Sequence, residues 1–318
     1  MLMTLLKRGL LALFVCLFTL SALAAPQHFA EAKKELRDHV YNDRNQVGDA
    51  YCQCTWDWTG RTGGRVHLRE CGYQVRAQAN RAARIEWEHI VPASNFGRQR
   101  QCWQNGGRRN CVSEDPVFRV MEADMHNLTP VVGEVNGDRS NYNFGPVRNV
   151  AAQYGACDFK VDFKHRTAQP PPALRGQVAR VYFYMADRYD LRLSKQQQRL
   201  LMAWDRGHPV SAWERQRDRR IAAIMGHSNP FVTGERSWTL NHRNSREGLV
   251  SSIADSRPPA NAESVRPTGP IHGNRNSKVY HLPQGCPSYN AMKPSNRVNF
   301  DSEAAARAAG YRKAGNCR

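Results

Sequence analysis

Two short stretches of the chain carry side chains that could hold a metal ion and supply a base. The first, residues 84–93, sets the carboxylate of Glu88 directly beside the imidazole of His89. The second, residues 127–142, adds carboxamides, among them Asn136. Mg²⁺ prefers oxygen ligands and keeps several waters, so one carboxylate and one amide suffice as the protein's contribution. Because a histidine beside such an ion can take a proton from water, these residue types predict metal-assisted hydrolysis of a phosphodiester.

The charge of the chain indicates a polyanionic partner. Lys and Arg number 46 against 28 Asp and Glu, which gives a formal net charge of +18. A surplus of this size attracts nucleic acid, anionic lipid surfaces or acidic glycans. Arg suits phosphate in particular, since its planar guanidinium can donate two parallel hydrogen bonds. The alternative is a charge that only keeps an exported protein in solution.

The N-terminus has the organisation of a secretory signal peptide. Lys7 and Arg8 form a positive region, residues 9–20 are an apolar run too short to span a bilayer comfortably, and small residues precede a cleavage point after Ala24. No later segment of the sequence is apolar enough to cross a membrane. We therefore expect residues 1–24 to be removed and the protein to be periplasmic or secreted.

The cysteines of the exported chain predict disulfides. Of the nine in the sequence, Cys16 lies in the signal peptide, which leaves an even set of eight: Cys52, Cys54, Cys71, Cys102, Cys111, Cys157, Cys286 and Cys317. Cys102 and Cys111 bracket a Gly-Gly turn, and the tail holds only Cys286 and Cys317, so we expect each of these couples to pair. The pairing of the other four stays open. Zinc ligation by Cys52, Cys54 and Cys71 is disfavoured, because the Cys-x-Cys spacing is tighter than in most structural zinc sites.

Hydrophobic periodicity predicts an α+β fold in two parts. The expected helices span residues 27–48, 115–127, 134–141, 175–189, 194–205 and 213–225, and the expected strands span 85–91 and 128–132, with a basic loop at 98–110. We assign residues 25–240 to a catalytic domain and the Ser-, Asn-, Arg- and Pro-rich residues 241–269 to a flexible linker. Residues 270–318 form a small module with a strand near 278–281 and a helix over 302–309.

Glu88 and His89 present a geometric difficulty. Neighbouring residues of a regular strand point to opposite faces of the sheet. Both side chains can serve one site only if the strand ends or twists at this point, which the proline at position 92 favours.

Four ordered motifs resemble the endonuclease I family, the periplasmic and secreted non-specific nucleases with a ββα-metal (His-Me finger) core. They are Trp-Glu-His-Ile-Val-Pro-Ala at 87–93, Gln-Cys-Trp-Gln-Asn-Gly-Gly-Arg at 101–108, Met-Glu-Ala-Asp-Met-His-Asn-Leu-Thr-Pro at 121–130 and Gly-Glu-Val-Asn-Gly-Asp-Arg-Ser-Asn at 133–141. The resemblance covers roughly residues 27–233. It implies mixed helices and short strands around the ββα core, a Mg²⁺ cofactor (Ca²⁺ or Mn²⁺ being possible), and cleavage of DNA and RNA that leaves 5′-phosphate ends.

The resemblance also implies a role for each matched residue. Glu88 and Asn136 would bind the metal, and His89 would be the general base. Glu122 would orient the imidazole or support the metal-bound water, and Arg108 would hold the phosphate. In the family's core the Glu-His pair lies at a strand end and the asparagine on the crossing helix, which removes the difficulty over strand faces. His126, although it lies in a matched motif, is expected to be structural.

The tail is similar to the small zinc-binding module of DNA-alkylation repair proteins at residues 280–286 and 309–317. Ala314 stands where that module would have a ligand, so we expect a disulfide-held module that binds nucleic acid or a surface. A monomeric, non-catalytic DNA-binding protein is the main alternative to a monomeric nuclease, and the Glu-His pair with Asn136 argues against it. A metalloprotease is disfavoured because the sequence has no His-Glu-x-x-His motif.

Overall fold

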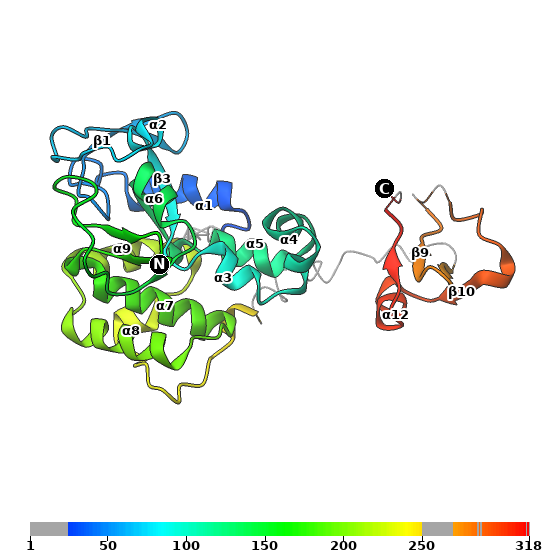
Figure 1. Ribbon diagram of the computed structural model, residues 1–318. Coiled ribbons are helices and arrows are strands. Elements are labelled where there is room, and N and C mark those ends of the chain that lie inside the picture. The colour runs from blue at the N-terminus through cyan, green and yellow to red at the C-terminus, as the bar shows by residue number, and fades with distance from the viewer. Residues whose placement is uncertain (1–24, 250–269, 285, 287, 316, 318) are drawn as a thin grey trace, which may run out of the picture. The chain divides into compact units, whose positions relative to one another are not determined.

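The computed structural model describes residues 25–249, 270–284, 286, 288–315 and 317. The chain divides into two compact units, Met1–Ser256 and Arg257–Arg318. The expected signal peptide and cleavage point lie outside the described residues. Within the described part, no helix is both long and apolar enough to cross a membrane. The α+β class expected from the sequence is confirmed by the order of helices and strands (Figure 1).

A two-stranded sheet and the helix that follows it form the centre of the first unit. Strands β3 (Ile85–His89) and β4 (Leu128–Val132) pair antiparallel, with Glu88 opposite Thr129. All five residues of β4 are buried. Helix α6 (Gly133–Arg139) starts directly after β4. A glycine is required at position 133, since a Cβ there would lie 2.6 Å from the main-chain oxygen of Arg81. The expected ββα arrangement is therefore present.

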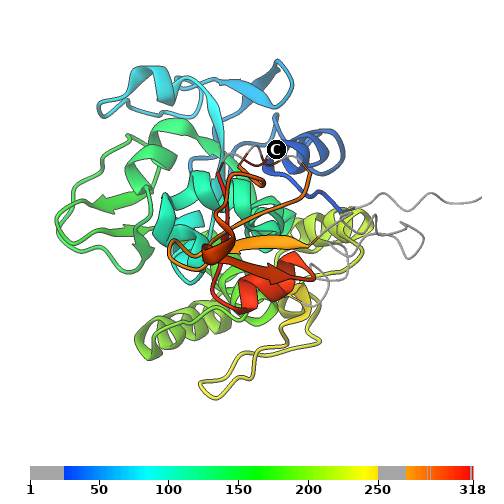
Figure 2. The ribbon, with the colours of Figure 1, turned by 90° about the vertical axis from the view of Figure 1, so that its right-hand side faces the viewer.

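Helices cover one side of this centre. In α7 (Arg175–Tyr189) every residue except Arg175 and Arg188 is buried, and α8 (Lys195–Gly207) packs beside it. The β1–β2 hairpin and α2 lie at the opposite end of the unit, with β3 and α6 between (Figures 1 and 2). The helices expected at 175–189, 194–205 and 213–225 are confirmed, the last as α9 (Ala212–Met225). The hydroxyl of Ser194 accepts a hydrogen bond from the amide of Gln197 at 3.1 Å, as expected of an N-cap.

Two expectations about secondary structure are wrong in extent. The helix expected over 27–48 ends at Val40: α1 (Phe29–Glu35) continues as one π-helical turn, Leu36–Val40. The basic loop expected at 98–110 contains a 3-10 turn, Gln101–Asn105, and the start of α4 (Gly107–Glu114). Gly106, at φ 128°, separates these two helical pieces in a conformation that favours glycine.

The ordered part of the first unit extends further along the chain than expected. Residues 242–249 belong to the first unit: His242 Nε2 lies 2.7 Å from a carboxylate oxygen of Asp187, and Leu249 packs against the core. Arg246 forms an ion pair with Asp190. The assignment of this stretch to a flexible linker is therefore wrong, and residues 250–269 lie outside the described part.

The other elements of the first unit are short. They are β1 (Trp56–Thr59), β2 (Gly63–Val66), α2 (Ala79–Ala82), α3 (Ala93–Gly97), α5 (Pro116–Ala123), a 3-10 turn (Met125–Asn127), β5 (Asn143–Phe144), β6 (Lys160–Asp162), β7 (Thr167–Gln169), a 3-10 turn (Pro172–Leu174) and α10 (Pro230–Thr233). The second unit has a four-stranded sheet in the order β10-β8-β9-β11, built from β8 (Ile271–Asn274), β9 (Val279–His281), β10 (Arg297–Phe300) and β11 (Arg312–Lys313), with a 3-10 turn (Pro294–Asn296) and α12 (Glu303–Ala308). The strand and helix expected in the tail are confirmed.

Four disulfides connect the eight cysteines. They are Cys52–Cys157, Cys54–Cys71, Cys102–Cys111 and Cys286–Cys317. The two pairings expected from the sequence are confirmed. The four cysteines whose pairing stayed open form one bridge across a sequence separation of 105 residues and one across 17. Zinc at Cys52, Cys54 and Cys71 is ruled out in this state, because each of these sulfurs is bonded to another.

Loss of the Cys52–Cys157 bridge should cost more stability than loss of Cys102–Cys111. By the chain-entropy account, a separation of 105 residues is worth about 5 kcal/mol and a separation of 9 about 3 kcal/mol. The comparison is Cys52→Ala/Cys157→Ala against Cys102→Ala/Cys111→Ala, measured by urea unfolding. An equal or larger loss in the second variant would contradict the expectation.

Candidate active site

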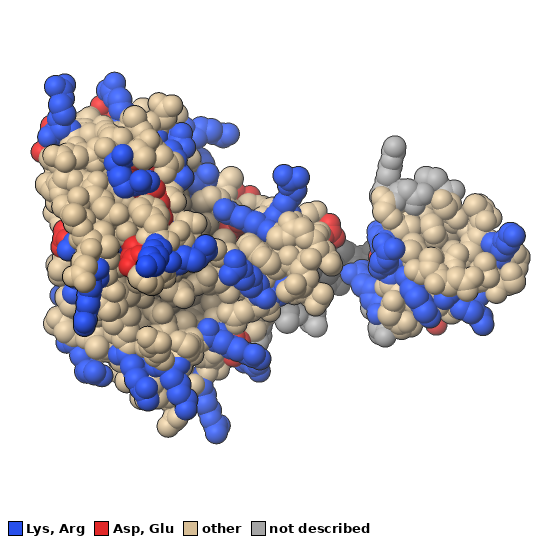
Figure 3. Space-filling view, viewed as in Figure 1, with Lys and Arg blue, Asp and Glu red and all other residues tan. Residues whose placement is uncertain are grey.

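A pocket of about 300 Å³ opens at the end of β3, beside α6 and α4. Four of the five residues predicted to form the site line it: Glu88, His89, Arg108 and Asn136. The fifth, Glu122, contacts His89 from α5. Lys and Arg side chains outnumber Asp and Glu on the face of the molecule that Figure 3 shows. The structure thus brings together residues that lie up to 48 positions apart in the sequence (136 − 88).

Glu88 is held through one of its two oxygens. Oε1 accepts hydrogen bonds from the Tyr51 hydroxyl and from Nη1 of Arg139, both at 2.9 Å. Oε2 receives no hydrogen bond from any residue that the structure describes. Burial raises the pKa of Glu88, while the charge of Arg139 and the two hydrogen bonds act in the opposite direction. A cation at Oε2 would favour the ionised carboxylate further.

Arg139, which the sequence did not single out, fixes the end of β3. Its side chain is fully buried, and Nη1 donates to the main-chain oxygen of His89 at 2.8 Å while Nη2 donates to that of Ile90 at 2.6 Å. The strand therefore stops at His89, and both Glu88 and His89 can line one pocket. Its place in the motif at 133–141 was the only cue, because one arginine among 46 Lys and Arg has no distinguishing pattern.

His89 is oriented by a main-chain contact. Its Nε2 lies 2.9 Å from the carbonyl oxygen of Glu122. A carbonyl can only accept, so Nε2 carries the proton and Nδ1 keeps a free lone pair. The ring packs against Phe29 with 4.8 Å between centroids. Burial lowers the pKa of His89 to about 3, the contact with Glu122 opposes this, and the charge of Arg108 adds to it. The imidazole is thus neutral near pH 7 and able to accept a proton at Nδ1.

The side chain of Glu122 contacts Arg108, whereas the main-chain carbonyl of Glu122 contacts the imidazole of His89. Its Oε1 accepts a hydrogen bond from Nε of Arg108 at 2.5 Å. The Arg108 side chain is half-exposed, and Nη1 and Nη2 have no hydrogen-bond partner among the described residues. Glu122 therefore positions two groups at once: the imidazole through its carbonyl, and the guanidinium through its carboxylate.

Asn136 is oriented by Glu86, a second residue that the sequence did not select. Nδ2 of Asn136 donates to Oε2 of Glu86 at 2.9 Å, which leaves Oδ1 available as a ligand. Burial acts to raise the pKa of Glu86, but hydrogen bonds from Arg81 and Arg84 lower it overall. A Cβ at Gly137 would lie 2.0 Å from Nη1 of Arg81, so the glycine makes room for that guanidinium against α6.

His126 lies outside the pocket, as expected for a structural residue. It is buried, and its Nε2 lies 3.1 Å from the main-chain oxygen of His227. Burial lowers the pKa of His126 to about 4, so it packs as a neutral ring.

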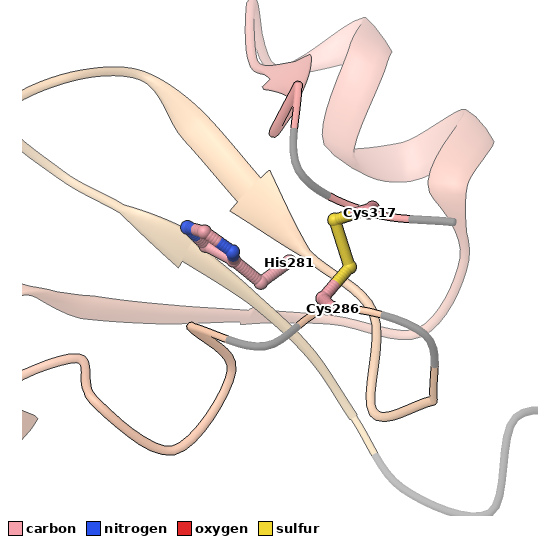
Figure 4. Close-up of side chains that lie close together, drawn as sticks. All are labelled: His281, Cys286 and Cys317. Atoms are coloured by element: carbon pink, nitrogen blue, oxygen red, sulfur yellow. A yellow bond between two sulfur atoms is a disulfide. The ribbon is translucent and has the colours of Figure 1, made fainter.

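The second unit contains the one group of His, Cys and acidic side chains that meets metal-site spacing within the described residues. Ligand atoms of His281, Cys286 and Cys317 lie within 4.8 Å of one another. Figure 4 shows the imidazole beside the bridge between the two sulfurs. Because the sulfurs are bonded to each other they are not thiolates, and this group does not hold zinc in the oxidised protein.

Comparison with known proteins agrees with the geometry of the first unit. Residues 28–235 match the Endonuclease I family. An extracellular deoxyribonuclease of Aeromonas hydrophila is 48% identical over 220 residues, covering 68% of this chain and 95% of the relative. A periplasmic deoxyribonuclease of the same organism is 52% identical over 183 residues, covering 57% and 76%. Endonuclease-1 of Buchnera aphidicola subsp. Acyrthosiphon pisum is 45% identical over 189 residues, covering 59% and 75%.

The tail matches a different family, ArfC, over residues 251–313. The Endonuclease I match spans all four motifs, the ββα centre and every residue that lines or orients the pocket. The chain therefore belongs to the endonuclease I family.

Proposed function

We propose that this protein is a periplasmic or secreted, metal-dependent endonuclease that acts as a monomer on DNA and RNA and leaves 5′-phosphate ends. One observation carries the proposal: a single pocket presents Glu88, Asn136, the neutral imidazole of His89 and the guanidinium of Arg108. The relatives named as deoxyribonucleases and endonucleases, periplasmic or extracellular, support the same activity and location.

The donor atoms at the pocket suit a hard divalent cation. The oxygens free to bind it are Oε2 of Glu88 and Oδ1 of Asn136, because the other polar atom of each side chain is already hydrogen-bonded. Mg²⁺ takes this kind of ligand, and Ca²⁺ and Mn²⁺ share the preference. When bound, such an ion neutralises the negative charge that develops on the phosphate and the leaving oxygen.

The residues of the pocket divide the work of hydrolysis. Nδ1 of His89 takes the proton from the attacking water. The carbonyl oxygen of Glu122 continues to accept the hydrogen bond from Nε2–H and so stabilises the imidazolium. Arg108 binds a non-bridging phosphate oxygen with its free Nη atoms. The water oxygen bonds to phosphorus, the bond between phosphorus and the 3′ oxygen breaks, and the departing 3′ oxygen takes a proton from solvent, which gives a 5′-phosphate and a 3′-hydroxyl. Burial disfavours the charged imidazole, so His89 readily returns its proton to solvent.

Recognition in this account rests on phosphate. A net charge of +18 attracts any polynucleotide, and contacts to phosphate carry no sequence information. We therefore expect weak sequence preference and activity that falls as the salt concentration rises.

Chelation should abolish cleavage reversibly. Supercoiled plasmid incubated with the oxidised protein and EDTA should stay intact, and excess Mg²⁺ should restore nicking. The product ends should accept label from a kinase only after phosphatase treatment, since they carry 5′-phosphate. A protein that binds the plasmid without cutting it, under Mg²⁺, Mn²⁺ or Ca²⁺, would favour the alternative of a non-catalytic DNA-binding protein.

Loss of the Glu86 carboxylate should weaken metal binding through Asn136. Residues that orient a ligand in this way typically change metal affinity about 10- to 100-fold. Glu86→Ala should raise the Mg²⁺ concentration for half-maximal activity by that factor, and Glu86→Gln should do so less, since its amide oxygen can still accept from Asn136. Glu70→Ala, which removes an exposed carboxylate elsewhere, is the control. An unchanged Mg²⁺ requirement in Glu86→Ala would disprove the role.

A further inference from the structure

A second cavity adjoins the active-site pocket along α3. The active-site pocket is lined by Ala93 and Ser94 of this helix and by Asn141. Asn95, the next residue of α3, and Asn143, two positions after Asn141, line a cavity of about 280 Å³. Nδ2 of Asn95 donates to Oδ1 of Asn143 at 3.2 Å, which joins the two walls. We call this second cavity the α3 groove.

The α3 groove carries two arginines that are free to bind an anion. Arg98 at the end of α3 and Arg192 after α7 both line it, and both are exposed. Neither guanidinium forms an ion pair within the part of the chain that the structure describes. Arg100 differs, because it binds Asp115 through Nε and Nη2 at 2.5 and 2.9 Å.

A hydrogen bond connects the two segments that carry these arginines. The main-chain amide of Arg192 donates to the side-chain oxygen of Gln99 at 3.0 Å, which ties its loop to the residue after Arg98. Asp190, the acid whose pKa Arg192 affects, is already bonded to Arg246. Two cationic side chains that line one cavity make it attractive to an anion.

The other residues that line the α3 groove suit a sugar-phosphate strand. They suit a metal ion or an apolar carboxylic acid less well. Among the described residues no carboxylate lines the α3 groove, and Gln99, Gln197 and Ser194 add amide and hydroxyl groups. Arg98 lies one helical turn beyond Ser94, a rise of about 6 Å along the axis. At about 3.4 Å per nucleotide of one strand, this is a step of one or two nucleotides from the pocket.

We propose that the α3 groove binds the substrate strand one or two nucleotides away from the scissile phosphate, with Arg98 and Arg192 on its phosphates. The inference rests on the proposed nuclease function and adds a binding subsite to it. Its consequence is that the enzyme prefers long strands to substrates that fill only the catalytic pocket.

The test compares Arg98→Ala/Arg192→Ala with Arg61→Ala/Arg69→Ala. The control pair loses the same charge at exposed arginines that line neither cavity. The measured quantity is kcat/KM for a long single-stranded oligonucleotide and for a dinucleotide, over a series of salt concentrations. In Arg98→Ala/Arg192→Ala the ratio of the two values should fall about tenfold, and the slope of log kcat/KM for the long strand against log salt should become shallower by roughly 1.4.

The control pair should keep the wild-type ratio and slope, and Arg98→Lys/Arg192→Lys should retain most of both. Equal ratios in Arg98→Ala/Arg192→Ala and in the control pair would overturn the α3 groove proposal. Wild-type protein that cleaves neither substrate would instead overturn the nuclease function, so the two failures are distinguishable.

Discussion

Replacing His89 with alanine should lower kcat for phosphodiester cleavage by about 10²- to 10⁴-fold, the usual contribution of a positioned general base. The imidazole is neutral and lines the pocket, and because its Nε2–H donates to the carbonyl of Glu122, Nδ1 is the nitrogen that can accept a proton. No other histidine lines the pocket within the described residues. Turnover should therefore fall while the arginines that bind phosphate stay in place.

The measurement is kcat at saturating substrate, together with a gel-shift assay of DNA binding in EDTA. His165→Ala is a matched control, since His165 is exposed and pairs only with Asp162. Binding should be unchanged in both variants. If His89→Ala cleaves at the wild-type rate, the assignment of the general base is incorrect.

Replacing Glu88 with alanine should remove activity and destabilise the fold together. Arg139 is fully buried, and Glu88 is the one carboxylate within the described residues with which it forms an ion pair. Breaking a buried pair by removing one partner typically costs about 3–5 kcal/mol, because the remaining charge is uncompensated. The same carboxylate supplies the proposed metal ligand, so metal-dependent cleavage should be lost as well.

The double variant Glu88→Ala/Arg139→Ala separates the two effects. It removes both charges, so urea unfolding should show it to be more stable than expected from the sum of the single variants. Cleavage should remain absent in the double variant. A single Glu88→Ala protein with wild-type unfolding free energy would show that Arg139 does not depend on this carboxylate.

The sequence predicted the parts of this structure that depend on local pattern. Helix α7 has the bounds expected for it, and Ser194 caps α8 as its residue type suggested. The site residues came from ordered motifs, and the structure places them around one pocket. What was missed depends on contacts between distant segments. Arg139 bonds to residues about 50 positions earlier, and nothing in its own neighbourhood reports those partners.

A sequence does not reveal contacts made by main-chain atoms either. The carbonyl of Glu122 that orients His89 could come from any residue type, so the motif drew attention to the carboxylate instead. The end of the first helix at Val40 has a similar cause. Arg220 donates from α9 to the carbonyl of Val40, and Asn45 bonds to the oxygen of Trp56, so tertiary contacts replace helical ones in this stretch.

The disulfides connect stability to the site. Cys52 follows Tyr51, whose hydroxyl holds Oε1 of Glu88, and its bridge to Cys157 fixes that segment. Protein folded in a reducing compartment should therefore lack a formed pocket.

The most direct test of the account is the position of a bound ion. A crystal of the oxidised protein soaked in Mn²⁺ should give one strong anomalous peak in the pocket, with Oε2 of Glu88 and Oδ1 of Asn136 among its ligands and the His89 imidazole nearby but not bound to it. A peak coordinated elsewhere, or density that shows these three side chains directed apart, would contradict it.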